Sequence, residues 1–226
     1  MKIAVLGGTG SFGKALAARL AEGDDEIVIG SRDAERARAV AAEIGGNVAG
    51  ATNEDAVRGA DFAVLAVKAD AALDTARAVA GSLGRTPLLS VASDIRFERG
   101  VGMLPDPDAR SLAERVQELV DAPVVAGLHS VAAANLDEGL LDEDALVCGD
   151  DDNAKRLALE VAGRLVGGRA LDAGPLASAR ALEGLTAVIV NLNRRYKAHA
   201  GVRVTGVGSP EPAGSEAGGE SGTGVE

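Results

Sequence analysis

A glycine-rich segment near the N-terminus has the spacing of a phosphate-binding loop. Gly8, Gly10 and Gly13 form a G-x-G-x-x-G pattern between an apolar run at residues 2–6 and a helical pattern. We expect Gly8 to permit a tight turn, Gly10 to let the backbone approach a pyrophosphate, and Gly13 to let the helix pack closely on the strand. Unpaired N–H groups at the helix start would bind phosphates. The candidate dinucleotide-binding residues are Gly8, Thr9, Gly10, Ser11, Phe12 and Gly13.

The residues after the second apolar run favour NADP over NAD. An NAD-binding fold usually has Asp or Glu there for the ribose hydroxyls, whereas this chain has Ser31 and Arg32. Ser31 can donate a hydrogen bond to a phosphate oxygen, and Arg32 can bind the phosphate or stack on the adenine. Arg36 follows one helical turn later and can approach the same 2′-phosphate. The alternative for both arginines is a solvated position at the start of a helix, for which Asp33 is the expected N-cap.

A further candidate segment follows the apolar run at residues 62–67. Ligands of open α/β sheets bind beyond the carboxyl ends of the strands, where the strand order reverses. We therefore expect Val67 and Lys68 to border the nicotinamide ribose. Lys68 has the alternative interpretation of a solvated lysine.

Composition narrows the classes of partner. The net charge of −11 disfavours binding to nucleic acid or to anionic membranes. No apolar run reaches the roughly 20 residues needed to span a membrane, and no secretory signal is evident. Cys148, the single cysteine, cannot form an intrachain disulfide, and it is interpreted as a core residue. These features indicate a cytoplasmic protein. Aromatic residues make up only 2%, so we expect a ligand pocket of aliphatic side chains and backbone.

Strand and helix patterns alternate along the chain. Strands are expected at residues 2–6, 26–29, 62–67, 87–91, 123–128, 145–148 and 169–173, with a loop at residues 93–107 and a long final helix at residues 177–199. Alternation with short connections predicts an α/β Rossmann fold, a doubly wound parallel sheet, followed by a small C-terminal domain with helices. We place the NADP-binding domain at residues 1–130, the C-terminal domain at residues 131–207 and a disordered tail at residues 208–226.

Longer segments of the chain resemble one family. MKIAVLGGTGSFGKALAARLA, EIVIGSR, LVCGDDD and LDAGPLASARALEGLTAVIVNLNRRYKAHAGVRV are similar, in this order, to segments of the NADPH-dependent F420 reductases. The resemblance extends from Met1 to about Val207. The segments at residues 90–97 and 130–135 depart from the family pattern.

The resemblance implies reversible hydride transfer between NADP(H) and the deazaflavin coenzyme F420. It implies that residues 9–12, Ser31, Arg32 and Arg36 bind NADP, and that the deazaflavin lies against the nicotinamide beside the C-terminal domain. His129 aligns with a family Leu-His segment and is the candidate catalytic residue of the cleft. Direct transfer between two rings needs alignment of donor and acceptor carbons, and it requires no obligatory acid or base.

Several interpretations stay open. Asp150, Asp151 and Asp152 are read as a helix N-cap rather than a metal site, so no metal is expected. Arg194, Arg195, Lys197 and His199 either stabilise a helix C-terminus or bind the anionic tail of F420. The apolar stripe of the last helix, Leu182, Leu185, Ile189 and Leu192, is interpreted as core, with a homodimer contact over part of it as the alternative. The alternative functions are an NADP-dependent reductase of a small imine or ketone, and a non-catalytic NADP sensor.

Overall fold

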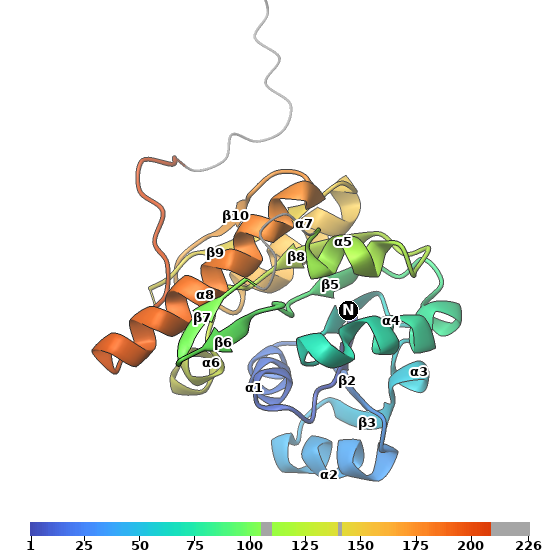
Figure 1. The fold of residues 1–226 in the computed structure, drawn as a ribbon. Coiled ribbons are helices and arrows are strands. Elements are labelled where there is room, and N and C mark those ends of the chain that lie inside the picture. The colour runs from blue at the N-terminus through green and yellow to red at the C-terminus, as the bar shows by residue number, and fades with distance from the viewer. Residues whose placement is uncertain (105–109, 140–141, 209–226) are drawn as a thin grey trace, which may run out of the picture.

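The computed structural model describes residues 1–104, 110–139 and 142–208. Its main feature is an eight-stranded sheet flanked by helices, with strand order β10-β9-β8-β5-β4-β1-β2-β3 (Figure 1). The strands are β1 (Lys2–Leu6), β2 (Glu26–Ser31), β3 (Val48–Thr52), β4 (Phe62–Leu65), β5 (Leu88–Ser90), β8 (Val124–Gly127), β9 (Ala145–Gly149) and β10 (Ala170–Asp172). Residues 209–226 of the expected tail lie outside the described residues.

The strand order creates a switch point in the middle of the sheet. The strands β3-β2-β1-β4-β5-β8 are parallel, and the chain order reverses between β1 and β4. This is the Rossmann arrangement that the alternating pattern predicts, and it places the carboxyl ends of β1, β4, β5 and β8 along one edge.

The predicted parallel sheet is confirmed except at one strand pair of the described sheet. β9 runs antiparallel to β8, with Ala126 opposite Cys148, whereas β10 is parallel to β9. Alternation of apolar and polar segments does not encode strand direction, because a buried strand is apolar in either orientation. The sheet continues across residue 130, and the domain boundary placed there stays a prediction.

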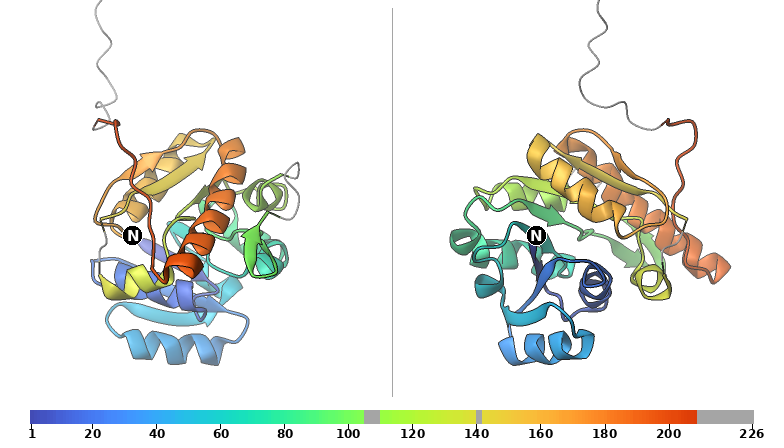
Figure 2. Two further views of the ribbon diagram at one scale, coloured as in Figure 1. Left: turned by 60° about the vertical axis from the view of Figure 1, so that its left-hand side comes forward. Right: turned by 180° about the vertical axis from the view of Figure 1, so that it is seen from behind.

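Two helical layers cover the sheet. One core contains residues of α1 (Ser11–Leu20), α2 (Ala34–Ile44), α6 (Ala133–Glu138) and α7 (Asp152–Gly163). The other contains residues of α3 (Asn53–Ala56), α4 (Ala69–Leu83), α5 (Leu112–Gln117) and the start of α8 (Ala179–Tyr196). Both faces of the sheet are therefore buried, which explains its continuous apolar strands (Figure 2).

A hairpin replaces part of the expected loop at residues 93–107. The strands β6 (Arg96–Glu98) and β7 (Val101–Met103) pair in an antiparallel manner, and β7 packs on α8 (Figure 1). Arg99 and Gly100 both have positive φ, 47° and 83°, as a two-residue hairpin turn requires. Three-residue strands carry too little periodicity to be recognised from sequence.

The last helix begins as a short 3₁₀ turn, Leu176–Ser178, and continues as α8 to Tyr196. Leu182 and Ile189 of the expected apolar stripe are each 6% exposed, whereas Leu192 is 39% exposed. The stripe therefore belongs to the core at one end and faces solvent at the other. No helix in the described part of the chain is both long and apolar enough to cross a membrane.

Candidate active site

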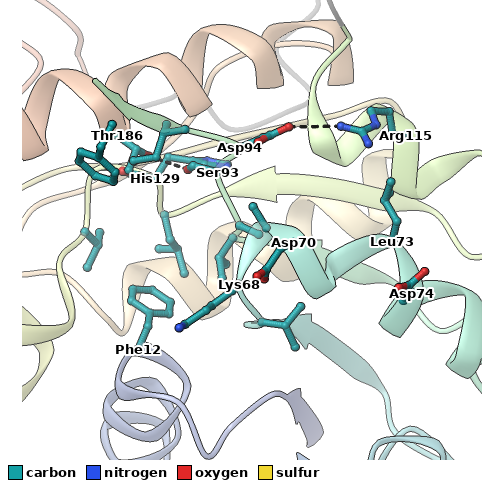
Figure 3. Close-up of a pocket in the computed structure, with 18 residues that line it drawn as sticks. Phe12, Lys68, Asp70, Leu73, Asp74, Ser93, Asp94, Arg115, His129 and Thr186 are labelled. Atoms are coloured by element: carbon teal, nitrogen blue, oxygen red, sulfur yellow. Dashed lines mark hydrogen bonds and ion pairs between the residues drawn. The ribbon is translucent and has the colours of Figure 1, made fainter. Parts of the chain in front are cut away.

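A pocket of about 790 Å³ opens at the carboxyl edge of the parallel strands. Segments after β4, β5 and β8 form its walls, together with the start of α1 and one residue of α8. The lining residues are Phe12, Val67, Lys68, Ala69, Asp70, Leu73, Asp74, Val91, Ala92, Ser93, Asp94, Ile95, Phe97, Arg115, Leu128, His129, Val131 and Thr186. Figure 3 shows Phe12 and Lys68 on one side, with Ser93, His129 and Thr186 across from them. The position and volume suit a binding site for small molecules.

The glycine loop joins β1 to α1 with close backbone contacts. A Cβ added to Gly13 would lie 2.7 Å from the Gly8 Cα, so the packing role expected for Gly13 is observed. The positive φ of the turn occurs at Gly7, 75°, and a positive φ is absent at Gly8. Gly8 is instead enclosed, because a Cβ there would lie 2.9 Å from the Val5 carbonyl oxygen and from the Ile29 side chain.

The N-terminus of α1 presents unpaired backbone donors. Its N-cap is Gly10, which provides no side chain to accept from the first-turn N–H groups, and the first turn contains no acidic residue. Ser11 is exposed at this end. These features fit an anion outside the helix, because the helix dipole and free N–H groups favour negative charge.

Two arginines lie next to this loop, at the end of β2. Gly7 N–H donates to the Gly30 carbonyl at 3.0 Å, which connects the glycine loop to the segment containing Ser31 and Arg32. Arg32 and Arg36 are exposed, and neither forms an ion pair with any residue that the structure describes. Both guanidinium groups are therefore available to a phosphate.

Asp33 has the capping role that the sequence predicts. Its carboxylate accepts from the N–H groups of Glu35 and Arg36 at 2.9 and 3.2 Å. The Asp33 N–H donates to Ser31 Oγ at 3.2 Å, which leaves the Ser31 hydroxyl hydrogen free for a phosphate oxygen. The negative charge of Asp33 is thus directed to its own helix.

The segment after β4 contacts the glycine loop, and the predicted contact of Val67 and Lys68 with the nicotinamide ribose stays a prediction. A Cβ on Gly7 would lie 2.5 Å from Val67 Cγ1, so the two segments are in close contact. Lys68 is exposed, caps α4 through its backbone and lines the pocket. Asn53 is a residue that sequence analysis missed: it is 7% exposed, and its side-chain oxygen accepts from the Gly7 N–H at 3.4 Å.

His129 lines the pocket from the loop after β8. It is 6% exposed, and neither ring nitrogen has a hydrogen-bond partner of normal geometry in the described structure. Burial lowers the pKa of His129 to about 4, and the nearby Ala92 carbonyl offsets this effect only in part. The imidazole is therefore neutral at pH 7, with one donor and one acceptor unused. The preceding Leu128 has a φ of 64°, a strained conformation for a large side chain.

Thr186 connects three segments around His129. Its hydroxyl donates to the His129 carbonyl at 2.8 Å and is 2.7 Å from the Ser93 hydroxyl (Figure 3). Since the Thr186 hydrogen is used on His129, Ser93 is the donor in the second bond. The sequence does not mark Thr186 as a site residue, since its only signal is a polar residue within the apolar pattern of a helix.

Aromatic side chains do line the pocket, contrary to the expectation of a wholly aliphatic one. The chain has three phenylalanines and one tyrosine. Phe62 is fully buried in the core, whereas Phe12 and Phe97 both contribute to the pocket. A low aromatic content constrains the number of these side chains but not their positions.

Charged groups surround the open side of the pocket. Asp94 pairs with Arg115 of α5 at 3.4 Å, and both line the cavity (Figure 3).

The position of α5 depends on Glu183 of α8, which is fully buried and accepts from the N–H groups of Leu112 and Ala113 at 2.6 and 3.4 Å. Desolvation raises the pKa of Glu183 to about 7, against the opposing effect of these two N–H groups.

The remaining candidates lie outside the pocket. Cys148 is fully buried with no disulfide, and desolvation raises its pKa to about 11, so its interpretation as a core residue is confirmed. Asp151 accepts from the Ala154 N–H at 2.8 Å and is the N-cap of α7. Among described residues, no group of three His, Cys, Asp or Glu side chains is arranged to hold a metal. Arg194, Arg195 and Lys197 are exposed at the end of α8, beyond the pocket.

Comparisons with known proteins agree with this geometry. The family described as "NADP oxidoreductase coenzyme F420-dependent" matches residues 2–94. The F420-dependent NADP reductase of Methanocaldococcus jannaschii is 34% identical over 91% of this chain and 98% of its own. The reductase of the same name from Methanothermobacter marburgensis is 36% identical over the same shares.

A solved structure from Arthrobacter, provisionally described as an F420-dependent NADP reductase, superposes with a TM-score of 0.77. It is 29% identical, and the match covers 87% of this chain and 95% of that one. The similarity thus extends well beyond the glycine loop to the pocket and α8. The chain belongs to the family of F420-dependent NADP reductases.

Proposed function

We propose that this protein transfers a hydride between NADP(H) and the deazaflavin coenzyme F420. The observation that carries the proposal is the pocket at the switch point, which adjoins the glycine loop on one side and the unpartnered His129 on the other. One cavity thereby borders both a dinucleotide-binding loop and a second set of side chains. The names of relatives that match nearly the whole chain give the identity of the two substrates.

The residues present fit NADP. The backbone around Gly8, Thr9, Gly10, Ser11, Phe12 and Gly13 would hold the pyrophosphate at the open end of α1. Arg32 and Arg36 would hold the 2′-phosphate, with Ser31 donating from its free hydroxyl hydrogen. Val67 and Lys68 would border the nicotinamide ribose, since they lie between the glycine loop and the pocket.

The rest of the pocket fits a second flat ring. The two coenzymes supply the redox chemistry when bound, as a hydride passes directly between ring carbons. The chain must hold these carbons about 3–3.5 Å apart and exclude water. His129 contributes a neutral donor and acceptor, and the Thr186 bond to its carbonyl fixes its backbone. We assign His129 an orienting role that can assist proton transfer, without an obligatory acid or base.

The test is to mix purified protein with NADPH and oxidised F420 and to follow the deazaflavin absorbance. We expect rapid loss of the oxidised spectrum with NADPH and far slower loss with NADH. Using NADPH deuterated at C4, mass spectrometry should find deuterium at C5 of the deazaflavin. Absence of turnover with F420, or turnover of a small cyclic imine or ketone in its place, would overturn the proposal.

We further propose a cytoplasmic homodimer that contacts through α8. Val188, Leu192 and Tyr196 repeat at four-residue spacing and are 52%, 39% and 68% exposed. A stripe of this kind on one helix face is typical of a contact surface. Light scattering after gel filtration should give the mass of two chains, and that of one chain after charged residues replace Val188 and Leu192.

A further inference from the structure

Phe97 has an unusual position for an aromatic residue in this chain. It lies on β6, lines the pocket and is nevertheless 54% exposed. A phenylalanine stabilises a fold chiefly through its burial, so folding by itself gives no reason to place one at this exposed position. Of the three phenylalanines, the one in the core is Phe62, and the other two both reach the pocket.

The backbone opposite Phe97 is shaped to accommodate its ring. Phe97 pairs across the hairpin with Gly102, and a Cβ added at that glycine would lie 3.4 Å from Phe97 Cε1. The same Cβ would lie 3.5 Å from the Ala187 carbonyl and from Asn191 Oδ1. Glycine therefore lets one edge of the ring rest on β7 while the rest of the ring is left uncovered.

The hairpin is fixed to α8 independently of Phe97. The Gly102 N–H donates to Asn191 Oδ1 at 2.7 Å, and Asn191 Nδ2 donates to the Gly102 carbonyl at 2.9 Å. The Ser93–Thr186 bond attaches the preceding loop to the same helix. Because polar contacts hold the hairpin, the Phe97 ring is held at the pocket without being needed to attach it.

We propose that Phe97 is a specificity-determining residue for the second substrate, whose conjugated ring it contacts as an aromatic wall of the pocket. This rests on the proposed function and deepens it. Across the pocket, Phe12 belongs to the glycine loop and hence to the NADP side. Phe97 lies on the α8 side of the pocket with His129 and Thr186, the side that the proposed function assigns to the deazaflavin. Aromatic faces attract flat conjugated rings beyond simple apolar burial, and they discriminate against non-planar molecules.

The experiment measures KM and kcat for each substrate in the unmutated protein and in Phe97→Ala, Phe97→Leu and Phe97→Tyr, together with the Kd for F420 from fluorescence titration. We expect Phe97→Ala to raise both KM and Kd for F420 about five- to tenfold. Phe97→Leu should raise them about threefold, and Phe97→Tyr should keep them within about twofold. The KM for NADPH and the melting temperature should not change, since a half-exposed ring on an independently attached hairpin adds little to stability.

Val101→Ala is the matched control, because Val101 lies on the same hairpin, is 50% exposed and is not among the pocket residues. It should leave all constants unchanged. If Phe97→Ala leaves the KM and Kd for F420 unchanged while the unmutated protein turns over normally, the role of Phe97 is overturned and the proposed function is not. Full recovery in Phe97→Leu would also overturn it, as would a change in oligomeric mass without a change in Kd. Failure of the unmutated protein to bind or reduce F420 would overturn both proposals.

Discussion

The Thr186 hydroxyl donates a 2.8 Å hydrogen bond to the backbone carbonyl of His129, across 57 positions of sequence. This bond joins α8 to the strained turn after β8, where Leu128 has a φ of 64°. A strained conformation persists only where surrounding contacts favour it. Thr186 is therefore a positioning residue for the imidazole, whose two nitrogens have no hydrogen-bond partner of normal geometry among the described residues.

Replacing Thr186 by Val should lower kcat/KM for F420 about five- to tenfold, because the His129 carbonyl and Ser93 each lose a hydrogen bond worth roughly 1 kcal/mol. Thr186→Ser keeps the hydroxyl and should recover most of the activity. Steady-state kinetics with each substrate varied in turn provide the measurement. Equal loss in both variants would attribute the effect to packing of the methyl group.

Arg32→Ala should narrow the preference for NADPH over NADH by roughly 1.5–3 kcal/mol, the scale of a charged hydrogen bond. The physical reason is that Arg32 has no described ion-pair partner and lies beside Ser31 at the end of β2. Isothermal titration of each variant with NADPH and with NADH measures the difference between the two binding free energies. Arg38→Ala is the control, since Arg38 is also exposed on α2 but faces away from Arg36 by half a turn. Equal affinities for the two cofactors in the unmutated protein would contradict the assignment.

Lowering the pH should destabilise the protein through His129. Burial lowers its pKa from 6.5 to about 4, so the unfolded chain takes up a proton at a higher pH than the folded one. The contribution of neutral His129 to stability is complete above pH 6.5 and is lost as the pH falls toward 4. At pH 5 the loss amounts to about 2 kcal/mol. Urea unfolding at pH 7 and pH 5 should show a larger decrease for the unmutated protein than for His129→Asn, and identical decreases would refute this.

Glu183 should produce a dependence of opposite sign. Desolvation raises its pKa from 4.5 to about 7, even though Arg180 lies 3.8 Å away and two N–H groups favour the ionised form. This contribution to stability is therefore present below pH 4.5 and is lost as the pH rises toward 7. Glu183→Gln keeps an acceptor for the Leu112 N–H and should be about 3 kcal/mol more stable relative to the unmutated protein at pH 8 than at pH 4. Glu160→Gln, on the surface of α7, controls for the removed charge.

Replacing Arg194, Arg195 and Lys197 by Gln together should raise the KM for F420 severalfold and leave the KM for NADPH unchanged. These side chains begin about 12 Å along α8 from Thr186, a distance that the anionic tail of F420 can span. Arg194 also lies against the hairpin turn, as a Cβ on Gly100 would be 2.8 Å from its guanidinium. Raising the salt concentration should reduce the difference between the two proteins. A salt-independent difference would exclude an electrostatic role.

The sequence by itself determined the local geometry of the glycine loop and of the segment after β2. The close contact of Gly13 with Gly8, the Asp33 cap and the exposed positions of Arg32 and Arg36 all follow from short segments whose residues act on their immediate neighbours. Local backbone sterics and helix capping are properties of adjacent residues, so spacing is sufficient to predict them. The positive φ at Gly7 rather than Gly8 is a shift of one residue within the same turn.

Only the tertiary structure decided the rest of the pocket. Thr186 and Phe97 reach the pocket from segments with no motif, through the packing of α8 and the hairpin, and Asn53 of α3 reaches the glycine loop in the same way. The direction of β9 and the neutral state of His129 likewise depend on what surrounds them. Contacts between residues far apart in the chain depend on the packing of whole elements, and that packing leaves no pattern in the order of neighbouring residues.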